Sequence, residues 1–216
     1  MNNLFKSIVI AIQIYPLLAV CFTLPILLIP IIRYKKFNFM RIGLNYTMIF
    51  YFLCLFSLVF FPLPSTEQIA SLKSHSIQLI PFRFIADILR ETPFVFSNPH
   101  TYLPALFHRA VLQVVFNVLM MLPFGMLLRY CFGLKQNNII LFTFLLSLFI
   151  EIGQLTGLFF IYPGSYRLCD VDDLIANTIG GYLGYRIIHS FESYIPSLKV
   201  FDIALPTSLR SHRIHF

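Results

Sequence analysis

The chain has 216 residues, of which 58% are hydrophobic and only 12% are charged, and its mean hydropathy is +0.79. Soluble domains carry about 25% charged residues, so this composition excludes an ordinary soluble globule, and its apolar content excludes a disordered chain. The net charge of +7 comes from basic residues that flank long apolar runs. Because that arrangement is typical of membrane proteins, we expect no nucleic-acid partner.

Five apolar runs predict membrane-spanning helices, because each is long enough to cross a hydrocarbon core about 30 Å thick. They cover approximately residues 7–32, 42–61, 110–128, 139–162 and 173–189. The predicted fold class is therefore all-α, a polytopic transmembrane helical bundle. We expect residues 1–190 to form a single membrane domain and residues 191–216 to form a cytoplasmic tail.

The basic residues predict the orientation of the bundle. Only Lys6 precedes the first run, whereas Arg33, Lys35, Lys36 and Arg41 follow it. Cytoplasmic loops of membrane proteins carry an excess of Lys and Arg. The N-terminus is therefore expected outside and the C-terminus in the cytoplasm, and the loop between the fourth and fifth runs falls at the outer face.

The long connection at residues 62–109 contains a short amphipathic segment at 81–91. Phe82, Ile85 and Leu89 recur at helical spacing on one face, and Pro81 suits the first turn of a helix. We predict a helix in the outer interface, over the mouth of the bundle. A helix that only covers the bundle, without a functional role, is the alternative.

Polar residues in the fourth and fifth runs fall on single helical faces. The polar or small residues of the fourth run fall within an arc of about 120° around the helix axis. They are Thr143, Ser147, Glu151, Gln154 and Gly157. The fifth run repeats Asp170, Asp173, Asn177, Gly180 and Gly184 at steps of three and four residues. Polar side chains inside a membrane are costly, so both faces are expected to contact protein.

Small residues predict how these two helices pack. Gly153 and Gly157 in the fourth run, and Gly180 and Gly184 in the fifth, have the small-xxx-small spacing that lets helix backbones approach closely. We therefore expect the fourth helix to pack on the fifth, with Glu151 and Gln154 turned toward Asn177. Asp172 or Asp173 is expected to cap the fifth helix.

One arginine lies close to the acidic residues in the sequence. We predict that loop 162–172 dips inward and that Arg167 pairs with Glu151, Asp170 or Asp173 through its guanidinium group. Asn117 in the third run is expected to join from a third side. The predicted polar cluster comprises Asn117, Glu151, Gln154, Arg167, Asp170, Asp173 and Asn177. No catalytic residue, metal ligand or cofactor is assigned, because no histidine or cysteine spacing matches such a site.

Several motifs resemble those of the VanZ-like membrane proteins. Their first motif is similar to the segment from Asn117 to Gly125, which includes Pro123. Their E-x-x-Q motif resembles Glu151-Ile-Gly-Gln154. Their R-x-x-D-x-D-D signature, with the N-T-x-G-G that follows it, resembles the segment from Arg167 to Gly184. Leu79 to Phe82 is similar to a loop element of that family, with Gln78 where asparagine is usual. The resemblance covers residues 78–190 and implies a protein of the bacterial cytoplasmic membrane.

The family's namesake is associated with low-level resistance to teicoplanin, a lipid-tailed glycopeptide. The leading hypothesis is a non-enzymatic membrane protein whose outward-facing polar pocket binds membrane lipids, a lipid-linked cell-wall precursor or such a lipoglycopeptide. One alternative is a metal-assisted lipid phosphotransferase or hydrolase, in which Asp170, Asp172 and Asp173 would hold Mg²⁺ and Glu151 would act as general base. A second alternative is a purely structural scaffold.

Overall fold

The computed structural model of the chain describes residues 2–34, 36–61, 77–162, 164–165 and 167–204. Its regular elements are helices apart from four two-residue strands among these residues, which confirms the all-α class. The chain divides into two compact units. The terminal unit comprises residues 1–62 and 191–216, and the central unit comprises residues 63–190. The prediction of one membrane domain over residues 1–190 stays a prediction.

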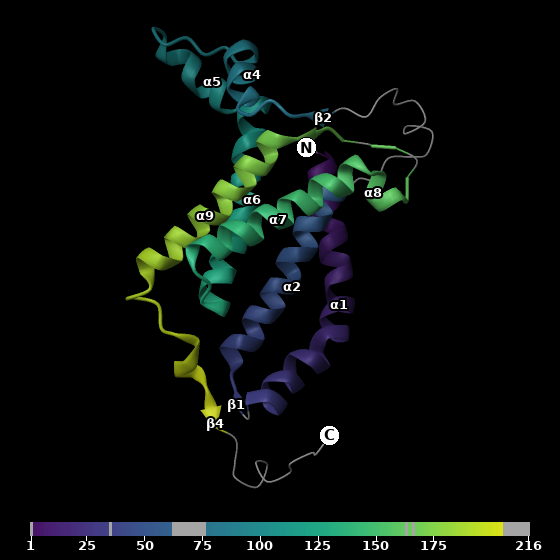
Figure 1. Ribbon diagram of the computed structural model, residues 1–216, viewed down its shortest axis with the longest axis vertical. Coiled ribbons are helices and arrows are strands. Elements are labelled where there is room, and N and C mark those ends of the chain that lie inside the picture. Colours follow the sequence, from purple (N-terminus) through teal and green to yellow (C-terminus); the bar gives the residue numbers. More distant parts are fainter. Residues whose placement is uncertain (1, 35, 62–76, 163, 166, 205–216) are drawn as a thin grey trace. The chain divides into compact units, whose positions relative to one another are not determined.

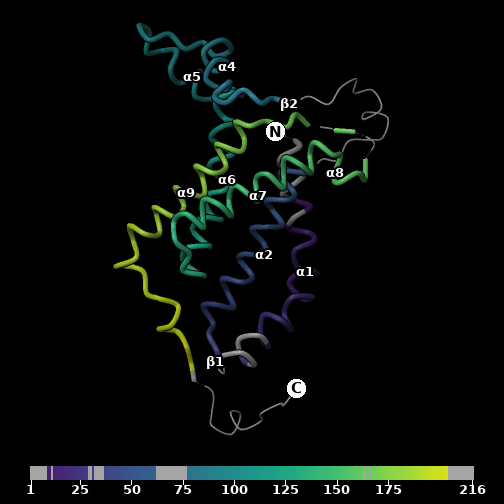
Figure 2. The backbone as a smooth tube through the Cα atoms, in the orientation of Figure 1, coloured from purple at the N-terminus to yellow at the C-terminus, as the bar shows by residue number. Residues whose placement is uncertain are grey.

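The terminal unit pairs two long helices, α1 (Asn2–Tyr34) and α2 (Phe39–Phe60). The Thr23 and Tyr46 hydroxyls join the two helices at 2.7 Å. The connection between them contains β1 (Lys36–Phe37), which pairs antiparallel with β4 (Ile203–Ala204) at the end of the described chain. A short 3-10 helix, η2 (Leu198–Phe201), precedes β4. The connection between α1 and α2 and the segment that contains β4 therefore meet at the start of α2, where β1 is labelled in Figure 2.

The central unit is built on three helices, α6 (Arg109–Phe132), α7 (Gln136–Leu155) and α9 (Val171–Phe191). These lie side by side in Figure 1, and glycines of α9 touch both of the other helices. Before them come β2 (Ile77–Gln78), α4 (Arg83–Glu91), η1 (Pro99–Thr101) and α5 (Tyr102–Leu106). The turn α8 (Gly157–Phe160) and β3 (Cys169–Asp170) connect α7 to α9.

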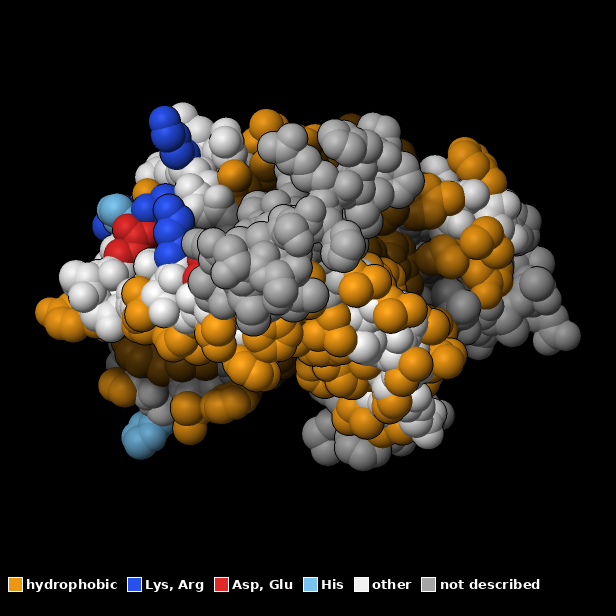
Figure 3. Space-filling model, turned by 90° about the horizontal axis from the view of Figure 1, so that it is seen from below, with side chains coloured by type: hydrophobic (Ala, Val, Ile, Leu, Met, Phe, Trp, Pro, Cys, Tyr) orange, Lys and Arg blue, Asp and Glu red, His pale blue; other side chains and the backbone are white. Residues whose placement is uncertain are grey.

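The predicted spans coincide with five long helices. Among the described residues, α2, α6 and α7 are long and apolar enough to cross a membrane, and α1 contains a shorter apolar stretch at Ile12–Leu28. Large apolar side chains along these helices are exposed, and they dominate the face shown in Figure 3. An apolar surface of this extent indicates contact with lipid.

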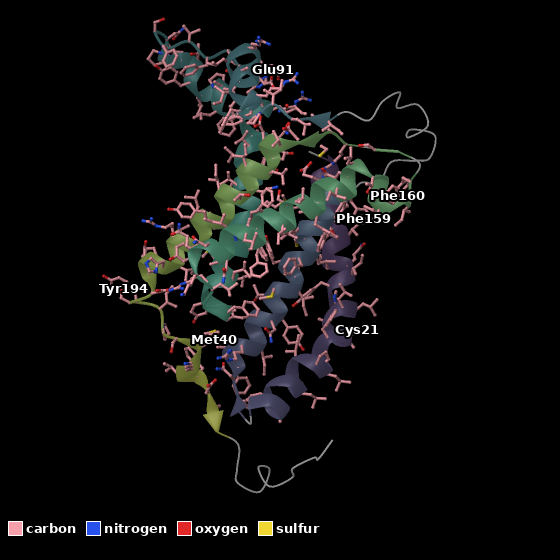
Figure 4. The ribbon with its side chains drawn as sticks, in the orientation of Figure 1. Cys21, Met40, Glu91, Phe159, Phe160 and Tyr194 are labelled. Carbon is pink, nitrogen blue, oxygen red and sulfur yellow. The ribbon has the colours of Figure 1, made fainter. Side chains whose placement is uncertain are left out.

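The fourth predicted span ends seven residues earlier than its apolar run. Helix α7 stops at Leu155, because Gly157 takes a left-handed backbone with φ +64°. The three following residues, Leu158 to Phe160, also have positive φ. The chain therefore turns sharply at α8, where Phe159 and Phe160 are labelled in Figure 4. A run of apolar residues alone gives no signal for this turn.

Candidate functional site

Four carboxylates gather where α7 ends and α9 begins. Glu151 lies in the last two turns of α7, Asp170 lies in β3, and Asp172 and Asp173 lie in the first turn of α9. Parallel pairing of β2 with β3, with Gln78 opposite Asp170, brings the segment before α4 to the same place. We call the four carboxylates the acidic junction. Three segments distant in the sequence therefore meet there.

Asp172 caps a helix other than its own. Its Oδ1 accepts from the backbone N–H of Phe82 at 2.6 Å, and its Oδ2 accepts from that of Phe84 at 2.9 Å. These N–H groups belong to the N-terminus of α4, where Phe82 has a φ of +64°. The Asp172 side chain is buried, with 5% exposure. A carboxylate at a helix N-terminus satisfies free N–H groups and complements the helix dipole, so Asp172 fastens α4 to the start of α9.

Asp170 takes the capping role predicted for its neighbours. Its Oδ1 accepts from the backbone N–H of Asp172 at 2.8 Å and from the Gln78 side-chain amide at 3.1 Å. The same Gln78 side chain also bonds both the N–H and the carbonyl oxygen of Ile80. Burial raises the pKa of Asp170, and the positive charge of Arg83 partly opposes that shift. Asp170 therefore starts α9 and connects it to the strand before α4.

Glu151 holds the loop that follows its own helix. Its Oε2 accepts from the backbone N–H of Asp170 at 3.1 Å, and the side chain is only 2% exposed. The Ser165 hydroxyl, also buried, is 3.2 Å from the carbonyl oxygen of Gln154. These bonds hold Ser165 and Asp170 of the predicted inward loop against α7, while residues 163 and 166 of that loop lie outside the described residues. Burial, followed by the negative charge of Glu151, raises the pKa of the adjacent Cys169 thiol to about 11.

The third helix contributes to the junction as predicted. The Asn117 side-chain amide of α6 donates to Asp173 Oδ1 at 2.5 Å, and that of Gln113 lies 3.5 Å from the same oxygen. Asn117 and Gln113 are one turn apart on α6, so both amides face the start of α9. The polar cluster thus joins α6, α7 and α9.

Asn177 lies one turn beyond Asp173 and has a different partner from the one expected. Its amide nitrogen donates to the Ser147 hydroxyl of α7 at 2.8 Å. Ser147 belongs to the predicted polar stripe, but the expected partners were Glu151 and Gln154. The Asn177 side chain is 2% exposed, and its Oδ1 has no hydrogen-bond partner among the described residues. This contact nevertheless confirms that the polar faces of α7 and α9 meet.

The glycines pack differently from the prediction. An added Cβ on Gly180 or Gly184 would collide with the backbone of α6, at Val118 and Leu122. The contact of α9 with α7 is made instead by Gly181, which lies against the Thr143 side chain. Helical periodicity identifies small-residue faces but not which neighbour each face meets, which is why the prediction was wrong on this point.

The second pair of glycines lies at the end of α7. Gly157 approaches the backbone of the following loop, since an added Cβ would lie 2.6 Å from the carbonyl oxygens of Tyr162 and Gly164. The prediction placed Gly157 between α7 and α9, but its close contacts are with the loop backbone, so Gly157 shapes the turn at α8. Gly153, one turn earlier, is buried.

The predicted pairing of Arg167 is wrong. Its side chain is exposed, and it makes no ion pair within the part of the chain that the structure describes. Its backbone carbonyl accepts from the Ser165 hydroxyl at 2.6 Å, which fixes the loop but leaves the guanidinium group outside. The prediction relied on proximity in sequence, but the loop is held by the Ser165 hydroxyl and the Arg167 backbone, and no bond between the guanidinium group and an acid is found among the described residues.

Two residues outside the predicted cluster take part in the junction: Gln78 and Asp172. The resemblance of the segment from Leu79 to Phe82 to a family loop element pointed to Gln78. The three aspartates of the R-x-x-D-x-D-D signature pointed to Asp172. Among the described residues, no three His, Cys, Asp or Glu side chains are arranged to hold a metal ion.

Comparison with known proteins identifies the family of the chain. No curated protein and no solved structure is similar to the chain at a significant level. The model of one protein family, described as VanZ/LLP1, matches residues 48–192. That range includes α6, α7, α9 and every residue of the acidic junction. Because the match covers well over half of the chain, this membrane protein belongs to the VanZ/LLP1 family.

Proposed function

We propose that this VanZ-like membrane protein binds the polar head of an amphiphilic envelope molecule at the acidic junction. The observation that carries the proposal is the excess of carboxylates there. Four acids lie together, and among the described residues none of them forms an ion pair with a lysine or arginine. Carboxylates in a partly buried site favour a ligand that brings hydrogen-bond donors or positive charge.

The apolar surface beside the junction supports a ligand with a lipid tail. Helix α4, whose N-terminus is held by Asp172, has no buried residue. Its apolar side chains Phe82, Ile85 and Leu89 are 56%, 48% and 59% exposed. A polar site next to an exposed apolar helix face matches the two parts of an amphiphile. In this proposal α4 lies in the outer interface, as the sequence predicts.

The exposed guanidinium group of Arg167 supports a ligand with an anionic group as well. Arginine binds phosphate and carboxylate through two parallel hydrogen bonds. Hydroxyl, amine and phosphate groups occur together in a lipid-linked cell-wall precursor, and hydroxyl, amine and carboxylate groups occur in a lipoglycopeptide such as teicoplanin. We therefore propose one of these as the ligand, at the outer face of the bacterial cytoplasmic membrane. Low-level teicoplanin resistance is the expected consequence of binding.

Susceptibility of cells to teicoplanin tests the proposal directly. Wild type, Arg167→Ala and an empty vector are compared at matched protein levels in the membrane. Arg167→Ala is the informative variant, because an exposed side chain without an ion pair among the described residues is not needed for folding. Asp87→Asn is the matched control, since Asp87 is an exposed partner of Arg83 at 3.9 Å and lies outside the junction.

The expected result is reduced susceptibility with wild type and Asp87→Asn, and loss of that effect with Arg167→Ala. A glycopeptide without a lipid tail should show no difference between the strains. Equal susceptibility of all four strains would contradict the resistance role. Mass spectrometry of lipids that co-purify with wild type but not with Arg167→Ala then separates a wall precursor from the antibiotic. Absence of any amphiphile in both assays would leave the junction a structural device and refute the proposal.

A further inference from the structure

We propose that the terminal unit binds an anionic phospholipid in a groove between the start of α2 and the returning C-terminal segment. This terminal groove is lined by Phe39, Met40, Val200, Phe201, Asp202 and Ile203 and has a volume of about 550 Å³. Its residues lie outside the range 48–192 that matches the family. The inference is therefore independent of the acidic junction and of the function proposed for it.

A buried asparagine builds the groove. Asn38 is 2% exposed, and its amide nitrogen donates to the Leu198 carbonyl oxygen at 2.6 Å and to Asp202 Oδ1 at 2.7 Å. Its Oδ1 accepts from the backbone N–H of Arg41 at 3.0 Å and thereby caps α2. The pairing of β1 with β4 fixes the same segment from its other end. A side chain that satisfies three separate partners holds this return of the chain in a defined position.

The groove presents apolar side chains to its surroundings. Phe39 is 69% exposed, Val200 is 72% exposed and Ile203 is 53% exposed. Phe39 and Met40 are also the first residues of α2, which is a candidate membrane span (Figure 4). The end of a span lies at the level where acyl chains meet headgroups. The occupant of an apolar groove at that level is a lipid.

Charge selects an anionic headgroup. Residues 33–41 contain four basic residues, Arg33, Lys35, Lys36 and Arg41, and no acidic residue. Lys199 is exposed next to Val200. The one acid of the groove, Asp202, is already engaged by Asn38 and lies 3.8 Å from the Arg41 guanidinium group. Basic residues at the end of a span attract anionic lipids at the membrane surface.

Fluorescence quenching tests the groove, because the chain contains no tryptophan. A tryptophan introduced by Val200→Trp is then the only such probe among the 216 residues. The protein is reconstituted in phosphatidylcholine vesicles that contain a small fraction of brominated phosphatidylglycerol or, in parallel, of brominated phosphatidylcholine. Tyr194→Trp is the matched control, since Tyr194 is 82% exposed in the same C-terminal segment but does not line the groove (Figure 4).

We expect brominated phosphatidylglycerol to quench the Val200→Trp probe more strongly than brominated phosphatidylcholine at equal mole fraction. Adding Lys199→Gln should lower the relative affinity for the anionic lipid about fivefold, as expected for removal of one cation near the surface. The Tyr194→Trp probe should show no such preference. Equal quenching of the Val200→Trp probe by both lipids would overturn the headgroup preference, and no quenching by either would overturn lipid binding in the groove. Unchanged thermal unfolding of Lys199→Gln shows that a loss of preference is not a loss of fold.

Discussion

The bond between Asp172 and the N-terminus of α4 leads to a quantitative prediction. Replacement of Asp172 by alanine removes two hydrogen bonds from backbone N–H groups to a buried carboxylate, at 2.6 and 2.9 Å. Hydrogen bonds to charged groups contribute about 1.5–3 kcal/mol each, and loss of an N-cap costs about 0.5–2 kcal/mol. The hydrogen-bond and N-cap energies describe the same two bonds and are therefore not added together. We expect α4 to be destabilised locally by about 2–4 kcal/mol.

Hydrogen exchange measures this local effect. The amides of residues 83–91 should exchange roughly 30- to 700-fold faster in Asp172→Ala than in wild type, since 1.4 kcal/mol corresponds to a factor of ten. Asp172→Asn keeps one acceptor oxygen and should have an intermediate effect. The control is Asp87→Asn, because an exposed ion pair contributes little to stability. If α4 exchanges at the wild-type rate in Asp172→Ala while α6 and α9 stay protected, the capping role assigned to Asp172 is refuted.

Three further predictions concern packing, pH and thiol reactivity. Gly184→Ala should lower the free energy of unfolding in lipid by about 1–3 kcal/mol, because its Cβ would meet the backbone of α6. Gly43→Ala, with nothing within 4 Å of its Cβ, should instead be neutral or stabilise α2 by about 0.5–1 kcal/mol; equal effects of the two substitutions would contradict the packing. Burial raises the pKa of Asp170 above its ordinary 3.8, so the folded state binds the proton more tightly than the unfolded state. Stability should therefore fall as the pH rises through the raised value, and unfolding of Asp170→Asn should lack this part of the pH dependence; an identical pH profile would rule out the assignment. With a pKa of about 11 against an ordinary 9.0, Cys169 should be alkylated roughly a hundredfold more slowly at pH 8 than a free thiol, in a variant whose other cysteines are serine; alkylation at the ordinary rate would contradict its burial.

The sequence predicts the helices of this protein well and their partners less well. Long apolar runs specify helices because a bilayer allows few other structures, and polar spacing specifies faces because the α-helix has a fixed period. The meeting of Asn117 with Asp173, and of the α7 and α9 polar faces through Asn177, follows from these two rules. Neither rule gives the rotation of one helix about another, so the contact of Gly184 with α6 could not be predicted.

The parts of the candidate site that escaped prediction all depend on irregular backbone. Asp172 caps α4, and Asp170 accepts a hydrogen bond from the Gln78 side chain. Both contacts depend on the pairing of β2 with β3, two-residue strands that lie 92 residues apart in the sequence. Arg167 is exposed and forms no ion pair with the acids among the described residues, while its backbone carbonyl is held by the Ser165 hydroxyl, which also contacts the Gln154 carbonyl oxygen of α7. Such turns and pairings are fixed by a few specific hydrogen bonds rather than by a repeating pattern, so periodicity carries no information about them.

The pairing of β1 with β4 restricts how the chain threads a bilayer. Strands that hydrogen-bond to each other lie on one side of a membrane, so the chain between residues 37 and 203 must cross it an even number of times. If α2, α6 and α7 each cross, three crossings are accounted for, and a fourth is required. Helix α9 has 21 residues, which at 1.5 Å per residue is long enough. Parity therefore predicts that α9 also crosses the bilayer, in agreement with its apolar run at 173–189, although Asp172 and Asp173 lie in its first turn.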